Sequence, residues 1–377
     1  MNTKIPNIQS QVASVPRVGA RCAIANSEIM TQVPFTCLYE LNPPTEHIFA
    51  WTFSVDSQHL ILSTYDSIPA ASGGFEPIKA HNVKGLNAQT GAELWSFSIP
   101  LYAPKHYWEK ILIASDNETL VGVDLRNSMI QVCNLQTGNL LYQIEVREGE
   151  IADVVLTPDA SMLISGTKDK MGRGDTPSDD LPILEYGRSV RLWDIKTGQL
   201  IKQLGDQTQA ITQLAVTPNG RFLLSGHLTE QGSGNTKVWD LQTGNKLHTL
   251  KKSDFVLCPD GITIAVPGST VDNRPEALDI INWQTGETLR QILVPHVIYR
   301  VAARHGTKIS QDGRWLFIST TGQYYRPDTI HVWDFQTGEK VGKFPEKLTH
   351  QYALSLDSQK IAVRPVSSRA LQVWSLS

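Results

Sequence analysis

The chain has 377 residues, of which 19% are charged, and 34 Lys and Arg against 37 Asp and Glu give a net charge of −3. This balance argues against a nucleic-acid-binding protein that works through bulk positive charge. No run of 18 or more apolar residues occurs, so no membrane-spanning helix is expected. The four cysteines, Cys22, Cys37, Cys133 and Cys258, share no CxxC spacing. We expect Cys133 and Cys258 to pack in a core, in a reducing, cytoplasmic setting.

Residues 1–32 stand apart, because the repeat described below begins after them. They contain no acidic residue before Glu28, and Arg17 and Arg21 interrupt any apolar stretch of a secretion signal. We expect a disordered or non-native N-terminal tail. The alternatives are an organelle transit segment and a native start at Met30.

Residues 33–377 carry a strand-and-turn motif that recurs along the chain. Its clearest copy, residues 236–244 (TKVWDLQTG), reads as a strand that suits a half-buried sheet surface, followed by a Thr-Gly turn in which Gly tolerates positive φ. The glycines of this turn lie 42–60 residues apart: Gly91, Gly138, Gly198, Gly244, Gly286 and Gly338. A period of this size with several strands per unit is typical of a propeller blade.

A polar turn between two apolar runs alternates with the first motif. Its copies begin at Val55, Ser115, Thr157, Thr217, Cys258, Ser310 and Leu356. Pro presets φ, Asp bonds to its own backbone and Gly accepts left-handed geometry, so such sequences form hairpin turns. Each unit therefore reads as four strands, a to d, with the polar turn between a and b and the Thr-Gly turn between c and d. We predict an all-β fold, a seven-bladed β-propeller of four-stranded antiparallel blades in one domain over residues 33–377.

These units resemble the WD40 repeat family. The Trp-Asp pair of that family stands intact in three units and changes to Leu-Asn, Cys-Asn, Ile-Asn or Trp-Ser in the others, and the Gly-His pair before strand a is missing. The resemblance implies a structural role for Trp193, Asp194, Trp239, Asp240, Trp333, Asp334 and Trp374. The first unit, residues 85–97, is also similar to quinoprotein-type (YVTN-like) propeller repeats.

The last repeat, residues 372–376, is not followed by a strand d. Residues 33–41 precede the first strand a and have no other place in the repeat. We predict that this N-terminal segment supplies the missing strand of the last blade, closes the ring and removes an open sheet edge.

Insertions concentrate in the b–c and d–a connections, which share one face of the disc. The long connections are residues 64–81, 100–110, 168–187, 227–235, 268–277, 295–306 and 321–329. Insertions gathered on one face often mark the binding face of a repeat protein, and aromatic and Arg side chains commonly anchor interfaces. The expected partner contacts are Tyr324, Tyr325, Arg326, Arg274, His106 and Trp108. For Trp108 the alternative is packing between blades.

The sequence contains no GxSxG, HExxH or GxxxxGK[ST] motif and no metal-ligand spacing. We therefore expect no enzyme, cofactor or metal, but a scaffold or adaptor that binds a protein or peptide partner, as a monomer or in a larger complex. The alternative is an enzyme or small-ligand binder that uses the central channel. An enzyme would concentrate titratable groups with perturbed pKa values there.

Overall fold

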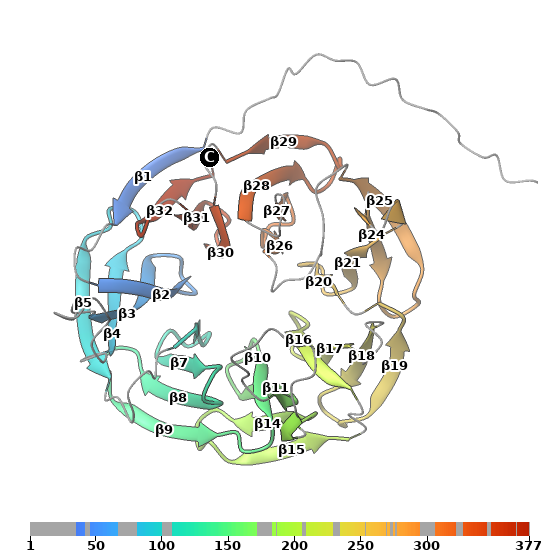
Figure 1. Cartoon of the computed structure of the whole chain (residues 1–377), viewed down its shortest axis with the longest axis horizontal. Coiled ribbons are helices and arrows are strands. Elements are labelled where there is room, and N and C mark those ends of the chain that lie inside the picture. Colours follow the sequence, from blue (N-terminus) through green and yellow to red (C-terminus); the bar gives the residue numbers. More distant parts are fainter. Residues whose placement is uncertain are drawn as a thin grey trace, which may run out of the picture. The chain divides into compact units, whose positions relative to one another are not determined.

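Seven four-stranded antiparallel sheets follow one another around a ring in the computed structural model (Figure 1). The description covers residues 35–41, 46–66, 81–99, 108–171, 183–185, 187–205, 209–228, 234–252, 254–268, 270–271, 274–275, 277–294, 306–321, 327–344, 348–366 and 368–376. These all belong to the compact unit Gln32–Ser377, which is separate from Met1–Thr31. The expected tail, residues 1–32, lies outside the described residues.

Each blade pairs its strands in the order a-b-c-d. Blades 1 to 3 are β2 (Glu46–Phe53), β3 (His59–Asp66), β4 (His81–Asn87) and β5 (Glu93–Ile99); β6 (Lys110–Ile113), β7 (Thr119–Asp124), β8 (Met129–Asn134) and β9 (Leu140–Glu145); and β10 (Glu150–Leu156), β11 (Met162–Lys168), β14 (Val190–Asp194) and β15 (Leu200–Leu204). Blade 4 is β16 (Ala210–Val216), β17 (Phe222–Leu228), β18 (Gly234–Asp240) and β19 (Lys246–Leu250). The predicted seven-bladed architecture is confirmed by these blades and the three that follow.

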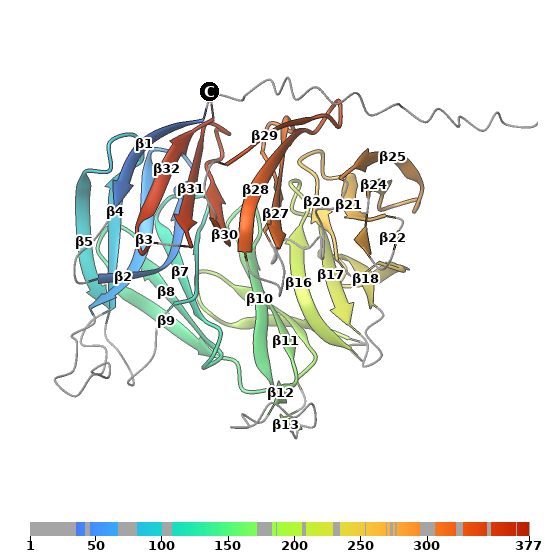
Figure 2. The same cartoon turned by 45° about the horizontal axis from the view of Figure 1, so that its top comes forward.

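Blades 5 and 6 keep the same order with shorter inner strands. They are β20 (Val256–Leu257), β21 (Thr263–Pro267), β24 (Ala277–Asn282) and β25 (Thr288–Leu293); and β26 (Thr307–Ile309), β27 (Trp315–Thr321), β28 (Pro327–Asp334) and β29 (Lys340–Lys343). Two small hairpins lie in b–c connections, β12 (Lys170–Met171) with β13 (Ile183–Glu185), and β22 (Thr270–Val271) with β23 (Arg274–Pro275). Figure 2 shows β12 and β13 beyond the lower ends of β10 and β11.

Blade 7 is built from both ends of the chain. Its inner strands are β30 (Leu348–Leu354), β31 (Lys360–Pro365) and β32 (Leu371–Ser375), and its outer strand is β1 (Thr36–Leu41). β1 runs antiparallel to β32 from Thr36 opposite Ser375 to Leu41 opposite Leu371. The predicted closure by the N-terminal segment is confirmed.

The core lies between the blades. Seven clusters of buried apolar side chains each join two neighbouring blades, and together they cover all seven seams. Cys133 and Cys258 are buried in two of them, as expected. Each blade therefore removes apolar surface from water only by packing against both of its neighbours, which is the driving force for ring formation.

The Thr-Gly turns owe their shape to the residue that follows Trp in the repeat. Asp194 Oδ1 accepts hydrogen bonds from the backbone N–H groups of Lys196 and Thr197, at 3.0 and 2.8 Å. Asn134, in a unit without Trp-Asp, accepts the same two bonds from Gln136 and Thr137. Asn forms the same turn as Asp because a single side-chain oxygen accepts both hydrogen bonds.

The polar turns between strands a and b use a hydroxyl and a carboxylate. In blade 3, Thr157 Oγ1 donates to Asp159 Oδ1 (2.6 Å) and accepts from the N–H of Met162 (3.0 Å). Blade 2 has Ala114 at the first position, and Thr119 supplies the hydroxyl to Asp116 instead (2.7 Å). The face that carries these turns is thus closed by local hydrogen bonds.

Candidate functional site

Two adjoining pockets open where blades 7, 1 and 2 meet at the inner strands. The first, here called the rim pocket, has a volume of about 470 Å³ and lies at the ends of strands that lead into the b–c connections. It is lined by His47, Ile48, Phe49, Tyr65, Glu109, Leu125, Arg126, Gln351 and Arg364. Its position is on the face with the long connections.

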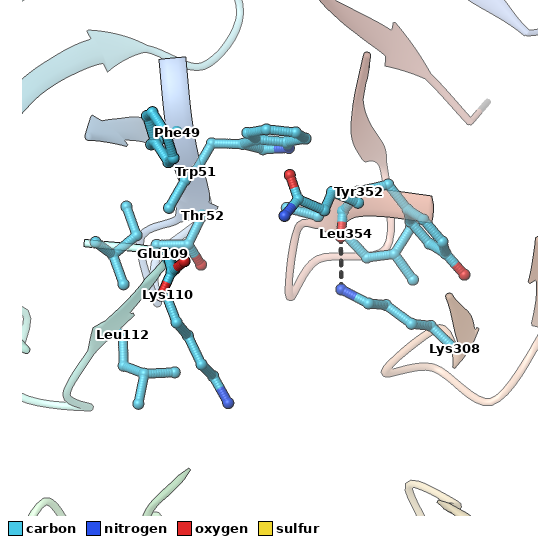
Figure 3. Close-up of a pocket in the computed structure, with 13 residues that line it drawn as sticks. Phe49, Trp51, Thr52, Glu109, Lys110, Leu112, Lys308, Tyr352 and Leu354 are labelled. Atoms are coloured by element: carbon cyan, nitrogen blue, oxygen red, sulfur yellow. Dashed lines mark hydrogen bonds between the residues drawn. The ribbon is translucent and has the colours of Figure 1, made fainter. Parts of the chain in front are cut away.

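The second, here called the axial pocket, has a volume of about 310 Å³ and continues along the inner strands toward the short-turn face. It is lined by residues 49–52 of β2, 109–112 at β6, Lys308 of β26 and 351–354 of β30. Both pockets share Phe49, Glu109 and Gln351, so they lie side by side and are together called the path below. Figure 3 shows Lys110 and Lys308 extending into the axial pocket from different blades.

Lys308 is the cation of the axial pocket that has no carboxylate beside it. Its ammonium donates to the carbonyl of Tyr352 (2.6 Å) and lies 4.9 Å from the centre of the Tyr352 ring. Among the described residues no Asp or Glu forms an ion pair with it. Burial, and secondarily the positive charge of Lys110, lower the pKa of Lys308 to about 8. Two of the three N–H donors of this ammonium are available to a ligand.

Lys110 is held differently. Its ammonium pairs with Asp153 Oδ1 at 2.6 Å and also donates to the carbonyl of Val154 at 2.8 Å. The other oxygen of Asp153 accepts the backbone N–H of Leu214 at 2.8 Å. Asp153 therefore links blades 2, 3 and 4. The Lys110 ammonium is already bound to groups of the neighbouring blade, so its main role is structural.

Arginines dominate the rim pocket and its edge. Arg364 donates to the carbonyl of Ile48, stacks 4.8 Å from the centre of the Trp51 ring and leaves its buried Nε without a hydrogen-bond partner. Arg369 lies 3.4 Å from His47 Nε2. Burial, followed by the charges of Arg369 and Arg364, lowers the pKa of His47. The described part of the chain places no carboxylate in an ion pair with Arg364 or Arg369.

Glu109 is the acidic residue that lines both pockets. Its Oε1 accepts from Arg126 Nε at 2.8 Å, whereas its Oε2 is buried without a hydrogen-bond partner. The two linings thus contain one carboxylate and four Lys or Arg side chains, namely Lys110, Arg126, Lys308 and Arg364. The path is electropositive although the whole chain has a net charge of −3, and such a site attracts anions.

The sequence prediction of partner contacts and the described site overlap little. Tyr324, Tyr325, Arg326 and His106 lie outside the described residues. Arg274 lies in the two-residue strand β23, with its side chain outside the description. These five stay predictions.

Trp108 requires a correction. It was expected to contact a partner, but its side chain is 1% exposed and packs in the seam between blades 1 and 2. A Cβ atom at Gly122 would lie 1.9 Å from the Trp108 ring, and the indole N–H donates to Gln131 Oε1 at 2.9 Å. The large apolar ring is thus accommodated by a glycine opposite it and by a partner for its polar atom, which is how a buried Trp is satisfied.

Lys110, Lys308 and Arg364 are not among the expected partner contacts, although Lys110 ends the long connection 100–110. Signals existed for the other two. Arg364 precedes a proline as Arg274 and Arg326 do, and Lys308 stands just before the polar turn at Ser310, where an inner strand is expected and charged residues are rarely buried without a partner. The expected contacts were taken from long connections, whereas the structure places these three residues on strands.

Hydroxyls and imidazoles within the blades serve the core. Ser225 Oγ accepts the indole N–H of Trp239 (2.9 Å) and lies 2.8 Å from His227 Nε2, all three being buried. This network joins strands b and c in a blade that lacks the Gly-His pair before strand a. Within the described residues, no group of three or more His, Cys, Asp or Glu is arranged to hold a metal ion.

The fold is a seven-bladed propeller, and two comparisons find similarity to WD repeats in part of it. Residues 198–240 match the family described as WD domain, G-beta repeat. The chain is also similar to Protein ROOT INITIATION DEFECTIVE 3 of Arabidopsis thaliana, with 26% identity over 133 residues, which is 31% of this chain and 29% of that protein. The similarity spans less than a third of that relative.

The chain is therefore a seven-bladed β-propeller in which residues 198–240 match a WD repeat. Propellers built from WD40 repeats are commonly protein-interaction scaffolds. The described residues include no helix with the length and apolar character to cross a membrane.

Proposed function

We propose that this propeller is a non-catalytic scaffold that binds a protein or peptide partner on the face carrying the b–c and d–a connections. The observation that carries the proposal is the difference between the two faces. On one face, the a–b and c–d turns are short and their polar groups bond to one another. On the other, β3 and β4 are separated by residues 67–80, and β17 and β18 by residues 229–233.

The rim pocket also favours this face as the binding surface. It opens at the b–c ends of β3, β7 and β31, and it presents Arg364, Arg126, His47 and Tyr65. Arg and Tyr are the side chains that interfaces use as anchors, because they combine a large contact area with directional donors. A concave site with such a lining suits a side chain or peptide segment of a partner.

Affinity capture from native lysate, read by mass spectrometry, tests the proposal. Wild type is compared with Tyr325→Ala/Arg326→Ala on the proposed face and with Gln136→Ala/Gln284→Ala, two exposed positions in Thr-Gly turns on the opposite face. We expect a partner that is retained by the Gln136/Gln284 variant and lost or reduced at least severalfold with the Tyr325/Arg326 variant.

A partner that is lost only with the Gln136/Gln284 variant would contradict the proposal and move the site to the short-turn face. Failure to capture any specific partner would favour the second candidate, a small-ligand binder. The observation that favours this candidate is the axial pocket itself, whose 310 Å³ could hold a small molecule.

A further inference from the structure

The path through the rim and axial pockets has an excess of positive charge that the protein does not neutralise. Arg364 in the rim pocket and Lys308 in the axial pocket both donate to backbone carbonyls, of Ile48 and Tyr352, rather than to carboxylates. A buried or half-buried charge without a counterion is unfavourable, because the lost hydration is only partly replaced. An anion at each position would provide the missing interaction.

Apolar side chains line both pockets together with the two cations. Phe49 belongs to both pockets, and Trp51, Leu112 and Leu354 line the axial pocket. The two linings therefore offer a cation in the rim pocket, a second cation in the axial pocket, and apolar side chains in both. A peptide that alternates acidic and apolar side chains matches this set of groups better than a compact ion, which needs only one of the two positions.

We propose that the rim and axial pockets together bind an extended acidic segment of the partner, with one carboxylate at Arg364 and another at Lys308. The inference rests on the proposed function, since it names the chemistry of the segment that the scaffold binds. Lys110 supplies a further positive charge, while its ion pair with Asp153 keeps it in place. Glu109, paired with Arg126, excludes a second anion from the junction of the pockets by charge repulsion.

The pH dependence follows from the groups around Lys308. Lys110, Asp153, Glu109 and Tyr352 are the titratable groups that line or adjoin its pocket. The charged form of Lys308 binds the carboxylate, and its pKa lies at about 8 in the free protein. Binding is therefore fully developed between about pH 5 and 7, where the carboxylates of the ligand are ionised as well, and it weakens as the pH rises above 8, while Lys110 keeps its partner Asp153.

Fluorescence anisotropy with the full chain tests the inference. The probe is a terminally blocked, fluorescein-labelled peptide pool of the pattern Glu-X-Glu-X-Glu, in which X is Leu or Phe, beside the same pool with Gln in place of Glu. We expect the Glu pool to bind at least about tenfold more tightly than the Gln pool, with a further loss at high salt, because charge-assisted contacts carry the difference.

Three variants place the effect at Lys308. Lys308→Met keeps an unbranched side chain but removes the charge, and is expected to weaken binding of the Glu pool about tenfold or more. Lys308→Arg keeps the charge and is expected to bind between pH 7 and 9.5 with a much smaller decrease than wild type. Lys343→Met, at an exposed position of the outer strand β29, is expected to change neither.

Equal binding of the Glu and Gln pools, or undiminished binding by a Lys308→Met protein with wild-type thermal stability, would overturn the inference. Binding of inorganic tripolyphosphate that depends on Lys308, without binding of the Glu pool, would overturn the peptide assignment and make this a site for free anions. A partner captured from lysate whose binding ignores Lys308→Met would leave the scaffold proposal intact and refute only the acidic segment.

Discussion

Single residues in the a–b turns show how neighbouring blades fit together. One residue of each a–b turn has a positive φ in all seven blades, yet only three of the seven are glycines, namely Gly220, Gly261 and Gly313. Ser57 and Asn117 stand at the same position and accept backbone N–H groups of the preceding blade, from Asp357 at 3.0 Å and from Val55 at 3.1 Å. The strain of a left-handed non-glycine residue is offset there by a bond between blades.

Glycine occurs where the preceding blade offers a proline instead of a donor. A Cβ atom at Gly261 would lie 2.8 Å from Cδ of Pro218, a ring atom that cannot swing away. At Gly313 the nearest atom to such a Cβ is Gln336 Nε2, at 4.0 Å. Both glycines have φ of 68°, so they share a backbone conformation and differ in the free space around a Cβ atom.

Substitution of these two glycines by alanine separates the energy cost of a left-handed backbone conformation from that of a steric clash. We expect Gly313→Ala to lower the free energy of unfolding by about 1 kcal/mol, the usual magnitude for an alanine in left-handed conformation. Gly261→Ala should lower it by at least about 1 kcal/mol more, because the methyl group meets Pro218. Urea unfolding of both variants beside wild type measures the difference, and equal losses would contradict the fit between neighbouring turns.

His81 gives stability a pH dependence at the residue scale. It is buried, lies 2.8 Å from Ser63 Oγ and packs edge-on to Trp108. Burial lowers the pKa of His81 from 6.5 to about 4. His81 is thus protonated below about pH 6.5 in the unfolded chain, but only below about pH 4 in the folded protein. The folded state is therefore stabilised fully above pH 6.5, and this stabilisation is lost as the pH falls toward 4.

Replacement of His81 by a neutral side chain should remove this component. Between pH 7.5 and pH 5, we expect wild type to lose about 2 kcal/mol more unfolding free energy than His81→Gln, from the separation of the folded and unfolded pKa values. Denaturant titrations of both proteins at the two pH values provide the comparison. A parallel decrease would mean that His81 is protonated as readily in the folded state as in the unfolded chain.

At the scale of elements, β1 decides whether the last blade is complete. Without it, β32 would expose a row of unpaired backbone N–H and C=O groups, which is a template for association with another chain. Tyr39 of β1 also reaches blade 1, where its hydroxyl donates to the carbonyl of Ala88 at 3.2 Å and its ring covers Gly91. β1 thus both pairs with the open edge of β32 and packs between blades 7 and 1.

Deletion of residues 31–41 is therefore expected to convert a monodisperse protein into one that aggregates, with a lower melting temperature. Size-exclusion chromatography with light scattering and a thermal melt are the measurements. Deletion of residues 2–30 is the matched control, since it leaves β1 in place and should change neither. A monomer with unchanged melting after loss of residues 31–41 would refute the closure.

The strands and turns of the blades could be predicted from the sequence because short-range interactions determine them. Asp and Asn at the ends of strands c, as at Asp194 and Asn134, fix turns by bonds to neighbours two and three residues away, so the turns can be predicted locally. The hairpin of β12 and β13 lies in a connection that had been interpreted as a loop. Its short strands lack the alternation that marks a strand of a blade.

The whole molecule is a closed series of seams, each with its own apolar cluster. Polar bonds add to these clusters at the inner strands, where Asp153 connects Lys110 of blade 2 with Leu214 of blade 4. Between blades 7 and 1, Trp51 donates its indole N–H to the carbonyl of Ala362 at 3.1 Å. No blade has a free side, so we expect the ring to unfold as one unit.

Asp153→Asn tests this coupling. The loss of charge weakens the contacts with both neighbouring blades, and we expect a decrease of about 1–3 kcal/mol in unfolding free energy. Tryptophan fluorescence and far-UV circular dichroism should still report one coincident transition at lower denaturant. Asp279→Asn is the control and should cost less, because among the described residues this carboxylate accepts a side-chain hydrogen bond from Gln291 of its own blade and none from a neighbouring blade. Separate transitions for the two probes would show that blades unfold independently.

By itself the sequence determined the number of blades, the strand order and the closure by residues 33–41, because these follow from a repeated pattern of short-range signals. Only the tertiary structure decided the candidate site. Lys308, Arg364 and Glu109 come from three blades and meet because the ring closes, and Trp108 is buried because Gly122 leaves room for its ring. Local patterns specify turns and strands, whereas burial and charge balance depend on neighbours far apart in the chain.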